Sequence, residues 1–212
     1  MPREPIAISR PPRLGLEILV VLGLSFGQSG VYALLHLARM LGESGSLRNQ
    51  TATLNRSVSD LSWLDVVYQL TGAAFAMAPV ALALYLLAIR PALIRSDQTP
   101  NPFRRLGLDF TQLPRDLGWG TALAACIGLP GIGFYLLGRQ LGWTAQVTTN
   151  NLGAHWWTVP VLVIAALAAG ASEEVVVVGY LMGRFESMAW PTWAAIAASA
   201  TLRGSYHLYQ GF

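Results

Sequence analysis

The sequence has little charge, no lysine and one cysteine, and each shortage excludes a class of protein. Only 12% of its 212 residues are charged, about half of the roughly 25% that is usual in a soluble domain. All 14 basic residues are arginines, the net charge is only +3, and the arginines lie between apolar runs rather than in one patch. We therefore expect no nucleic-acid partner. Cys126 has no second cysteine to pair with, which excludes an intrachain disulfide and a cysteine-based metal site.

Long apolar runs are what the sequence has instead, since 53% of its residues are hydrophobic. A helix that spans a membrane needs about 20 predominantly apolar residues. Five runs are long enough, at about 14–40, 64–89, 117–138, 157–182 and 190–209. The sequence therefore predicts an all-α fold, a polytopic helical bundle with five transmembrane helices in a lipid bilayer.

Arginines mark the connections on one side of this bundle. They concentrate in the N-terminal tail, in 90–116 and in a turn at Arg184, and they are fewer in 41–62 and 139–156. Positive charge accumulates on the cytoplasmic side of membrane proteins, so this pattern predicts a cytoplasmic N-terminus. We expect a multi-pass protein of the cell membrane, in a bacterial plasma membrane.

Three parts follow along the chain. We expect 1–13 to be a cytoplasmic tail, 14–100 to hold the N-terminal transmembrane helices, and 101–212 to form a core that carries the polar features described next. The first apolar run is too long for the central part of a signal peptide, so we interpret it as a retained signal anchor. The stretch 101–116 mixes apolar residues with arginines, and it is either a helix along the inner headgroups or a charged loop.

Two adjacent glutamates, Glu173 and Glu174, stand inside the fourth apolar run, in GASEEVVVVGYL. A charged residue at the centre of a membrane helix costs about 2.5–3.5 kcal/mol, whereas a good apolar residue returns only about 0.3–0.6 kcal/mol. The pair lies past the midpoint of the run, about 24 Å along it, which lowers this cost. Even so, both carboxylates should face a polar cavity or a partner rather than lipid. A carboxylate so placed can act as a general base.

Two other interpretations of the glutamates stay open. The sequence GASEE is also typical of a helix start, with Ser172 as the N-cap and two acids in the positive first turn, in which case the fourth helix is broken. Intramembrane acids also relay protons in ion-coupled transporters. A transporter more often shows inverted repeats, and this sequence has no internal repeat.

A second polar group stands in the fifth run, in LRGSYHLYQG. Arg203 and His207 are four residues apart and therefore share one face of a helix, which indicates an interior site. The alternative is an aromatic belt at headgroup level, in which Tyr206 and Tyr209 flank an interfacial histidine. Because a glutamate pair stands on the preceding helix, we favour the interior site.

At these residues the sequence resembles the intramembrane CAAX-protease and bacteriocin-processing (CPBP) family, which includes the type II CAAX prenyl endopeptidases. The family's first motif is Glu-Glu, three residues, then Arg, commonly continued by Gly-Tyr-Leu, and EEVVVVGYL matches it at both glutamates and at GYL. The second motif is Phe, three residues, then His, and RGSYH supplies His207. HLYQG is also family-like, and FRRLGLDF resembles the connection before the core helices. The resemblance covers about 100–212.

The sequence departs from the family pattern at three places. Val178 stands where the family has arginine, and Arg203 stands where it has phenylalanine. The family's later helix, with a second His and an Asn or Asp, has no counterpart before Phe212, so we expect a C-terminally truncated version of the family or a fragment.

The first two departures can be linked. Arg203 lies one turn before His207 and can supply, from the fifth helix, the guanidinium that the fourth helix lacks. This hypothesis predicts a contact between Arg203 and Glu173 or Glu174. The alternative is an arginine whose side chain extends to the membrane interface.

The resemblance implies an intramembrane endopeptidase that cleaves a membrane-embedded peptide or protein, CAAX-type substrates included, with a glutamate-activated water. In this interpretation Glu173 is the base, Glu174 orients it, and His207 stabilises the oxyanion with help from Arg203. The alternatives are a catalytically impaired scaffold or pseudo-protease, which Val178 favours, and a proton-coupled transporter, which we favour less.

A divalent metal such as zinc is the alternative chemistry, with Glu173, Glu174 and His207 as its ligands. The sequence offers only one well-placed histidine, because His36 and His155 stand at the ends of other apolar runs, where we expect them at the interface. We therefore expect either no cofactor or a metal whose ligand set is incomplete in this chain.

Overall fold

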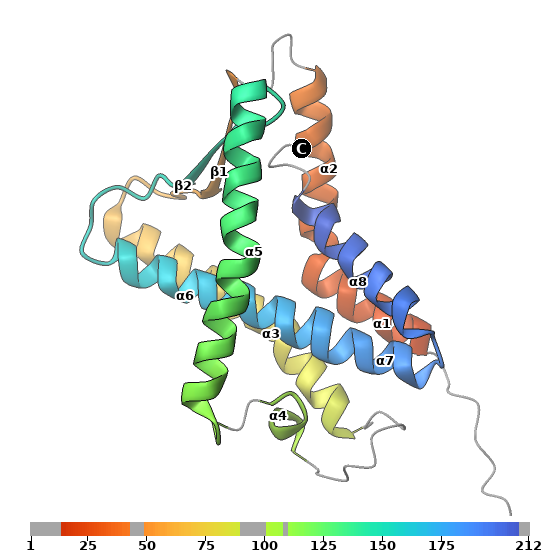
Figure 1. Cartoon of the computed structure of the whole chain (residues 1–212). Coiled ribbons are helices and arrows are strands. Elements are labelled where there is room, and N and C mark those ends of the chain that lie inside the picture. The colour runs from red at the N-terminus through yellow and green to blue at the C-terminus, as the bar shows by residue number, and fades with distance from the viewer. Residues whose placement is uncertain (1–13, 43–48, 90–100, 108–109, 208–212) are drawn as a thin grey trace, which may run out of the picture.

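The computed structural model describes residues 14–42, 49–89, 101–107 and 110–207, and the structural statements below concern these residues. Figure 1 shows long helices that cross one another, with a two-stranded sheet near one end of α5 and α2. The expected cytoplasmic tail lies outside the described residues.

Helices make up nearly all of the described chain. The elements are α1 (Leu14–Leu22), η1 (Gly23–Gly27), α2 (Gln28–Gly42), β1 (Thr51–Asn55), α3 (Ser62–Ile89), α4 (Pro102–Arg105), α5 (Leu113–Leu141), β2 (Gln146–Asn150), α6 (Thr158–Ala171), η3 (Ser172–Tyr180), α7 (Leu181–Ser187) and α8 (Thr192–His207), where η marks a π-helical segment. Four helices in the described residues are long and apolar enough to cross a membrane, namely Leu14–Met40, Ser62–Ile89, Leu113–Leu141 and Thr158–Ser187. The predicted all-α membrane bundle is confirmed, and these helices match the first four predicted runs.

The fifth predicted run, 190–209, is described only up to His207, so its assignment as a spanning helix stays a prediction. That run forms α8, which has 16 residues. At a rise of about 1.5 Å per residue this described part is about 24 Å long. Its last turn is polar, because it carries Arg203, Ser205 and His207. α8 packs against α2, α7 and η3.

The two strands were not predicted, and they join two connections that are far apart in the sequence. β1 pairs with β2 in parallel, with Thr51 opposite Gln146 and Asn55 opposite Asn150. Both strands are short and rich in threonine, a β-branched residue that favours extended backbone. The pairing requires the connections 41–62 and 139–156 to lie on one side of the bundle. This agrees with the sequence, in which both connections contain few arginines.

The core of the bundle surrounds η3 and α7. Val175, Val176 and Val177 are consecutive and all buried, so this stretch is enclosed on several sides. α3, α6, α7 and α8 all contact η3. In α5, by contrast, no residue of the most apolar stretch is buried, as expected of a helix that faces lipid. The segment that carries the two glutamates is therefore much more enclosed than α5.

The stretch 101–116 is neither a long surface helix nor simply a loop. Asn101 caps α4 by accepting a hydrogen bond from the Phe103 backbone N–H at 2.9 Å. Leu106, which follows α4, packs on the core and lies directly against Gly179 of η3. A Cβ atom at Gly179 would overlap the Leu106 side chain, so the glycine permits this close approach.

Candidate active site

The two glutamates stand at the start of η3, which continues α6 without a break. Ser172 has helical backbone angles, φ −62° and ψ −44°, and its hydroxyl donates a hydrogen bond to the Ala168 carbonyl at 2.9 Å. A serine that bonds one turn back is not an N-cap, so the interpretation of a broken fourth helix is wrong. π-helical turns are rare and often occur at functional sites. The local backbone therefore favours a role in chemistry over a role in capping.

The predicted contact between α8 and the glutamates is present. The Nη2 atom of Arg203 lies 2.8 Å from Oε1 of Glu174 and 3.2 Å from Oε2 of Glu173. One guanidinium thus bridges the adjacent carboxylates, which otherwise would repel each other. The guanidinium of Arg203 thus points to the glutamates, as the hypothesis predicts.

His207 lies on the other side of Glu173. Its Nε2 atom is 3.8 Å from Oε1 of Glu173, which is beyond hydrogen-bonding range, although one water molecule can bridge polar atoms at this separation. The two side chains are 52% and 30% exposed, so solvent reaches both. The oxygens of Glu173 are therefore divided, with Oε2 bound by Arg203 and Oε1 facing the imidazole.

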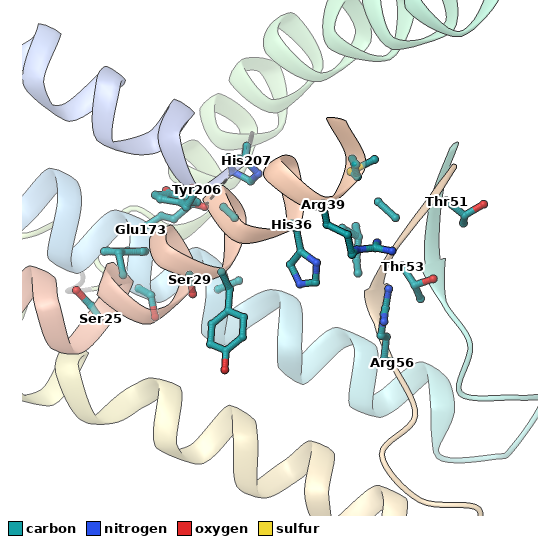
Figure 2. A pocket seen from close by; sticks show the side chains of 18 residues that line it. Ser25, Ser29, His36, Arg39, Thr51, Thr53, Arg56, Glu173, Tyr206 and His207 are labelled. Carbon is teal, nitrogen blue, oxygen red and sulfur yellow. Dashed lines mark ion pairs between the residues drawn. The ribbon is translucent and has the colours of Figure 1, made fainter. Parts of the chain in front are cut away.

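A cavity of about 590 Å³ adjoins this cluster. Figure 2 shows Glu173, Tyr206 and His207 gathered in one part of it, with His36, Arg39 and Arg56 farther along. The volume is within the range of about 300–1,000 Å³ that is typical of ligand sites. Glu174 and Arg203 do not line the cavity. A molecule in the cavity would therefore meet Glu173, while Glu174 binds Arg203 from outside it.

Tyr206 is a member of this cluster that the sequence did not identify. Its ring is only 8% exposed and stacks on Phe26 of η1, with ring centroids 5.0 Å apart. Its hydroxyl is buried, lies near enough to Glu173 to interact with the carboxylate charge, and makes no well-formed hydrogen bond within the described residues. Tyr206 is therefore packed inside the bundle rather than exposed on its surface.

The first spanning helix supplies one wall of the cavity, which the sequence analysis also missed. Its polar lining residues recur every three or four positions, which places them on one helical face. They are Ser25, Ser29, Tyr32, His36 and Arg39. This polar stripe in an apolar run is the signal that could have identified the wall, because polar residues in spanning helices face cavities.

The two remaining histidines differ in their surroundings. His36 was expected at the interface, but it lines the same cavity as His207. His155 lies apart from the cavity and stacks on Trp157, with ring centroids 5.1 Å apart. His36 is therefore a residue of the site region, and His155 is not.

Arg184 also has a different role from the one predicted. It lies in helix α7 rather than in a cytoplasmic turn, it is 2% exposed, and its Nε atom donates to Oε1 of Glu17 at 2.8 Å. The Tyr180 hydroxyl donates to the same oxygen at 2.9 Å, and Arg184 also donates to the Leu86 carbonyl at 3.0 Å. This arginine forms a buried link between α1, α3 and α7. The link was not predicted, because its partners are far apart in the sequence.

The cluster does not fit a zinc ion. A zinc site takes three or four protein ligands, and within the described residues no three His, Cys, Asp or Glu side chains form a group that could hold a metal. Arg203 occupies an oxygen of each glutamate. The positive guanidinium stands where a second cation would be repelled.

The comparison with known families agrees with this geometry. Residues 155–212 match the family model of Rce1-like type II CAAX prenyl endopeptidases. No curated protein and no solved structure matches the chain. The matched segment contains Glu173, Glu174, Arg203 and His207, so the resemblance to CPBP proteases is confirmed where the cluster lies. At the level of the family, the match supports a CAAX-type intramembrane protease.

Proposed function

We propose that this protein is an intramembrane endopeptidase that hydrolyses a peptide bond of a membrane-associated substrate with a water activated by Glu173. The observation that carries the proposal is the meeting of Glu173, Arg203 and His207 beside one cavity, from two helices of a membrane bundle. Charged side chains in such a bundle are costly and mark functional sites by default. The Rce1-like match supports the same class of reaction.

The nucleophile would be a water between the carboxylate and the imidazole. Oε1 of Glu173 accepts a proton from it, and the water oxygen attacks the carbonyl carbon of the substrate. The carbonyl oxygen takes the negative charge of the tetrahedral intermediate. When the intermediate collapses, the C–N bond breaks and the proton on Glu173 passes to the departing amine. Protons and electrons balance without a cofactor.

The neighbouring side chains have distinct roles in this reaction. Arg203 holds Oε2 of Glu173 at 3.2 Å and leaves Oε1 for the water. Glu174 binds the same guanidinium at 2.8 Å and keeps it in place. An N–H of His207 can donate to the oxyanion, which is the position where such a donor contributes most. Arg203 thus replaces from α8 the guanidinium that Val178 does not offer.

Cleavage by the full-length protein in liposomes tests the proposal. The probes are quenched-fluorescence peptides with an apolar or prenyl anchor, a CAAX-type peptide among them. Glu173→Gln and His207→Ala should each lower the rate by about 100-fold or more. Glu186→Gln is the matched control, because Glu186 is an exposed carboxylate on α7 that does not line the cavity.

Two outcomes would contradict the proposal. Equal cleavage by the wild type and by Glu173→Gln would exclude Glu173 as the base. A folded wild-type protein that cleaves no member of the series would favour the scaffold interpretation. Circular dichroism of each variant separates lost chemistry from lost structure.

A further inference from the structure

The cavity beside Glu173 extends well beyond the catalytic cluster. The wall that the first span supplies continues from Ser25 of η1, which lies near Glu173 in Figure 2, to Arg39 and Met40 of α2. Fourteen helical positions separate Ser25 from Arg39, which corresponds to about 21 Å. An extended peptide of about six residues covers the same length. The cavity can therefore accommodate several substrate residues on one side of the bond to be cleaved.

Two arginines line the far part of the cavity. Arg39 comes from α2 and Arg56 directly follows β1, and both line this part together with His36 (Figure 2). Thr51 and Thr53, alternate residues of β1, add hydroxyl groups to the same wall. Of the described residues that line the cavity, only Glu173 is acidic, and it belongs to the other part. Basic and acidic side chains thus line different parts of the cavity.

The position of these arginines relative to the membrane agrees with a role in binding. Arg39 ends the first spanning helix, and Arg56 precedes the second, which begins at Ser62. Guanidinium groups bind carboxylates and phosphates through paired N–H donors. At a membrane boundary such a bond is less screened than in bulk water, so it can discriminate between charged and neutral groups.

We propose that Arg39 and Arg56 bind an anionic group of the substrate, an acidic side chain or a free C-terminal carboxylate, about five or six residues from the cleaved bond. The proposal rests on the proposed function, because it assigns the cavity to the substrate. His36 lies one turn before Arg39 on the same helical face. In this proposal it contacts the substrate residues between the cleaved bond and the anionic group. The site therefore selects peptides by the spacing between a cleavable bond and a negative charge.

Binding to the inactive Glu173→Gln variant tests this inference without any cleavage. The probes are an apolar hexapeptide with a free C-terminal carboxylate, its C-terminal amide, and the amide with one internal aspartate, each measured by fluorescence anisotropy in phosphatidylcholine vesicles. We expect the peptides that carry a carboxylate to bind about tenfold more tightly than the neutral amide. Arg39→Gln and Arg56→Gln should each remove most of this preference and leave the binding of the neutral amide unchanged.

The matched control is Arg115→Gln, an exposed arginine at the start of α5 that does not line the cavity. It should retain the preference. Equal binding of charged and neutral peptides, or a preference that survives the double Arg39→Gln, Arg56→Gln variant, would overturn the proposal. Failure of Glu173 in cleavage is a separate result, because none of these measurements requires hydrolysis.

Discussion

Two arginine–carboxylate clusters lie at the two ends of η3, and they differ in burial. Arg184 and Glu17 are 2% and 12% exposed, whereas Arg203 and Glu173 are 36% and 30% exposed. We call the cluster of Arg184, Glu17 and Tyr180 the closed cluster. In it, Arg184 donates to the Glu17 carboxylate and to a backbone carbonyl, and Tyr180 donates to the same carboxylate. Neither Arg184 nor Glu17 lines the cavity beside Glu173.

We call the cluster of Arg203, Glu173, Glu174 and the adjacent Tyr206 the open cluster. Some of its hydrogen-bonding groups have no well-formed partner in the described residues. The Nε atom of Arg203 and the hydroxyl of Tyr206 are buried without a well-formed hydrogen bond in the described residues. Glu173 also turns one oxygen toward His207 and the cavity. The same pair of chemical groups thus serves two purposes. Where every donor and acceptor is used, the cluster fixes the fold, and where some are left over beside a cavity, it can bind and react.

The largest effect should come from breaking the closed cluster. Glu17→Ala leaves Arg184 buried without its carboxylate, which should cost about 3–5 kcal/mol of folding stability. The free energy of unfolding in detergent, with SDS as the denaturant, measures this loss. The double variant Glu17→Leu, Arg184→Met should recover much of it, because an apolar pair needs no counter-charge. A Glu17→Ala variant as stable as the wild type would show that the closed cluster does not hold the fold.

The corresponding change in the open cluster should affect catalysis instead. Arg203→Gln removes the group that fixes Oε2 of Glu173, and we expect the cleavage rate to fall by about 10- to 100-fold. The free energy of unfolding should change by less than about 1 kcal/mol, because the pair is partly exposed. Rates in liposomes and unfolding in detergent are measured on the same preparations. Similar stability losses for Glu17→Ala and Arg203→Gln would remove the distinction between the clusters.

A guanidinium at position 178 would sharpen the same distinction. Val178 is 40% exposed and lies four positions after Glu174 on η3, so an arginine side chain has room there. Adding Val178→Arg to Arg203→Gln should restore about fivefold of the lost rate, since the charge returns from a different helix. The rate of the double variant relative to Arg203→Gln is the measurement. A further loss would indicate that the position of the guanidinium, and not only its charge, determines the rate.

The charged residues of the open cluster could be predicted from the sequence, whereas those of the closed cluster could not, and the reason is physical. Glu173, Glu174, Arg203 and His207 could be identified because each charge stands out in an apolar run, and because the spacing between Arg203 and His207 sets a common helical face. Their contact could then be predicted, since the two helices are consecutive in the sequence. The first four spans were predictable for the same local reason, because hydropathy is a property of each run.

The features that escaped prediction depend on which distant segments meet. Glu17 and Arg184 are 167 positions apart, and nothing local shows that α1 packs against α7. β1 and β2 are short segments that become strands only through each other. Tyr206 resembled an interfacial residue because Phe26, which covers its ring, belongs to the first helix. Hydropathy identifies which segments are buried, and only packing specifies what each one contacts.

A smaller effect is expected at Tyr206, which lies beneath the open cluster. Tyr206→Phe keeps the ring that stacks on Phe26 and removes only the hydroxyl near Glu173. We expect cleavage to fall by about three- to tenfold, with stability unchanged, because the hydroxyl has no well-formed bond to lose. Tyr85→Phe, an exposed tyrosine of α3, is the control. An unchanged rate for Tyr206→Phe would place the hydroxyl outside the reaction.

The smallest effect is expected between the two clusters, at Gly179. A methyl group there would overlap the end of the Leu106 side chain, which can turn away, so Gly179→Ala should cost only about 1 kcal/mol of stability. Adding Leu106→Ala should relieve the overlap, although it removes a contact with the core. If η3 transmits strain to the glutamates, Gly179→Ala should also lower the cleavage rate, and Leu106→Ala should restore it. If the rate is unchanged while stability falls, the two clusters are independent, and the closed one serves the open one only by holding the bundle together.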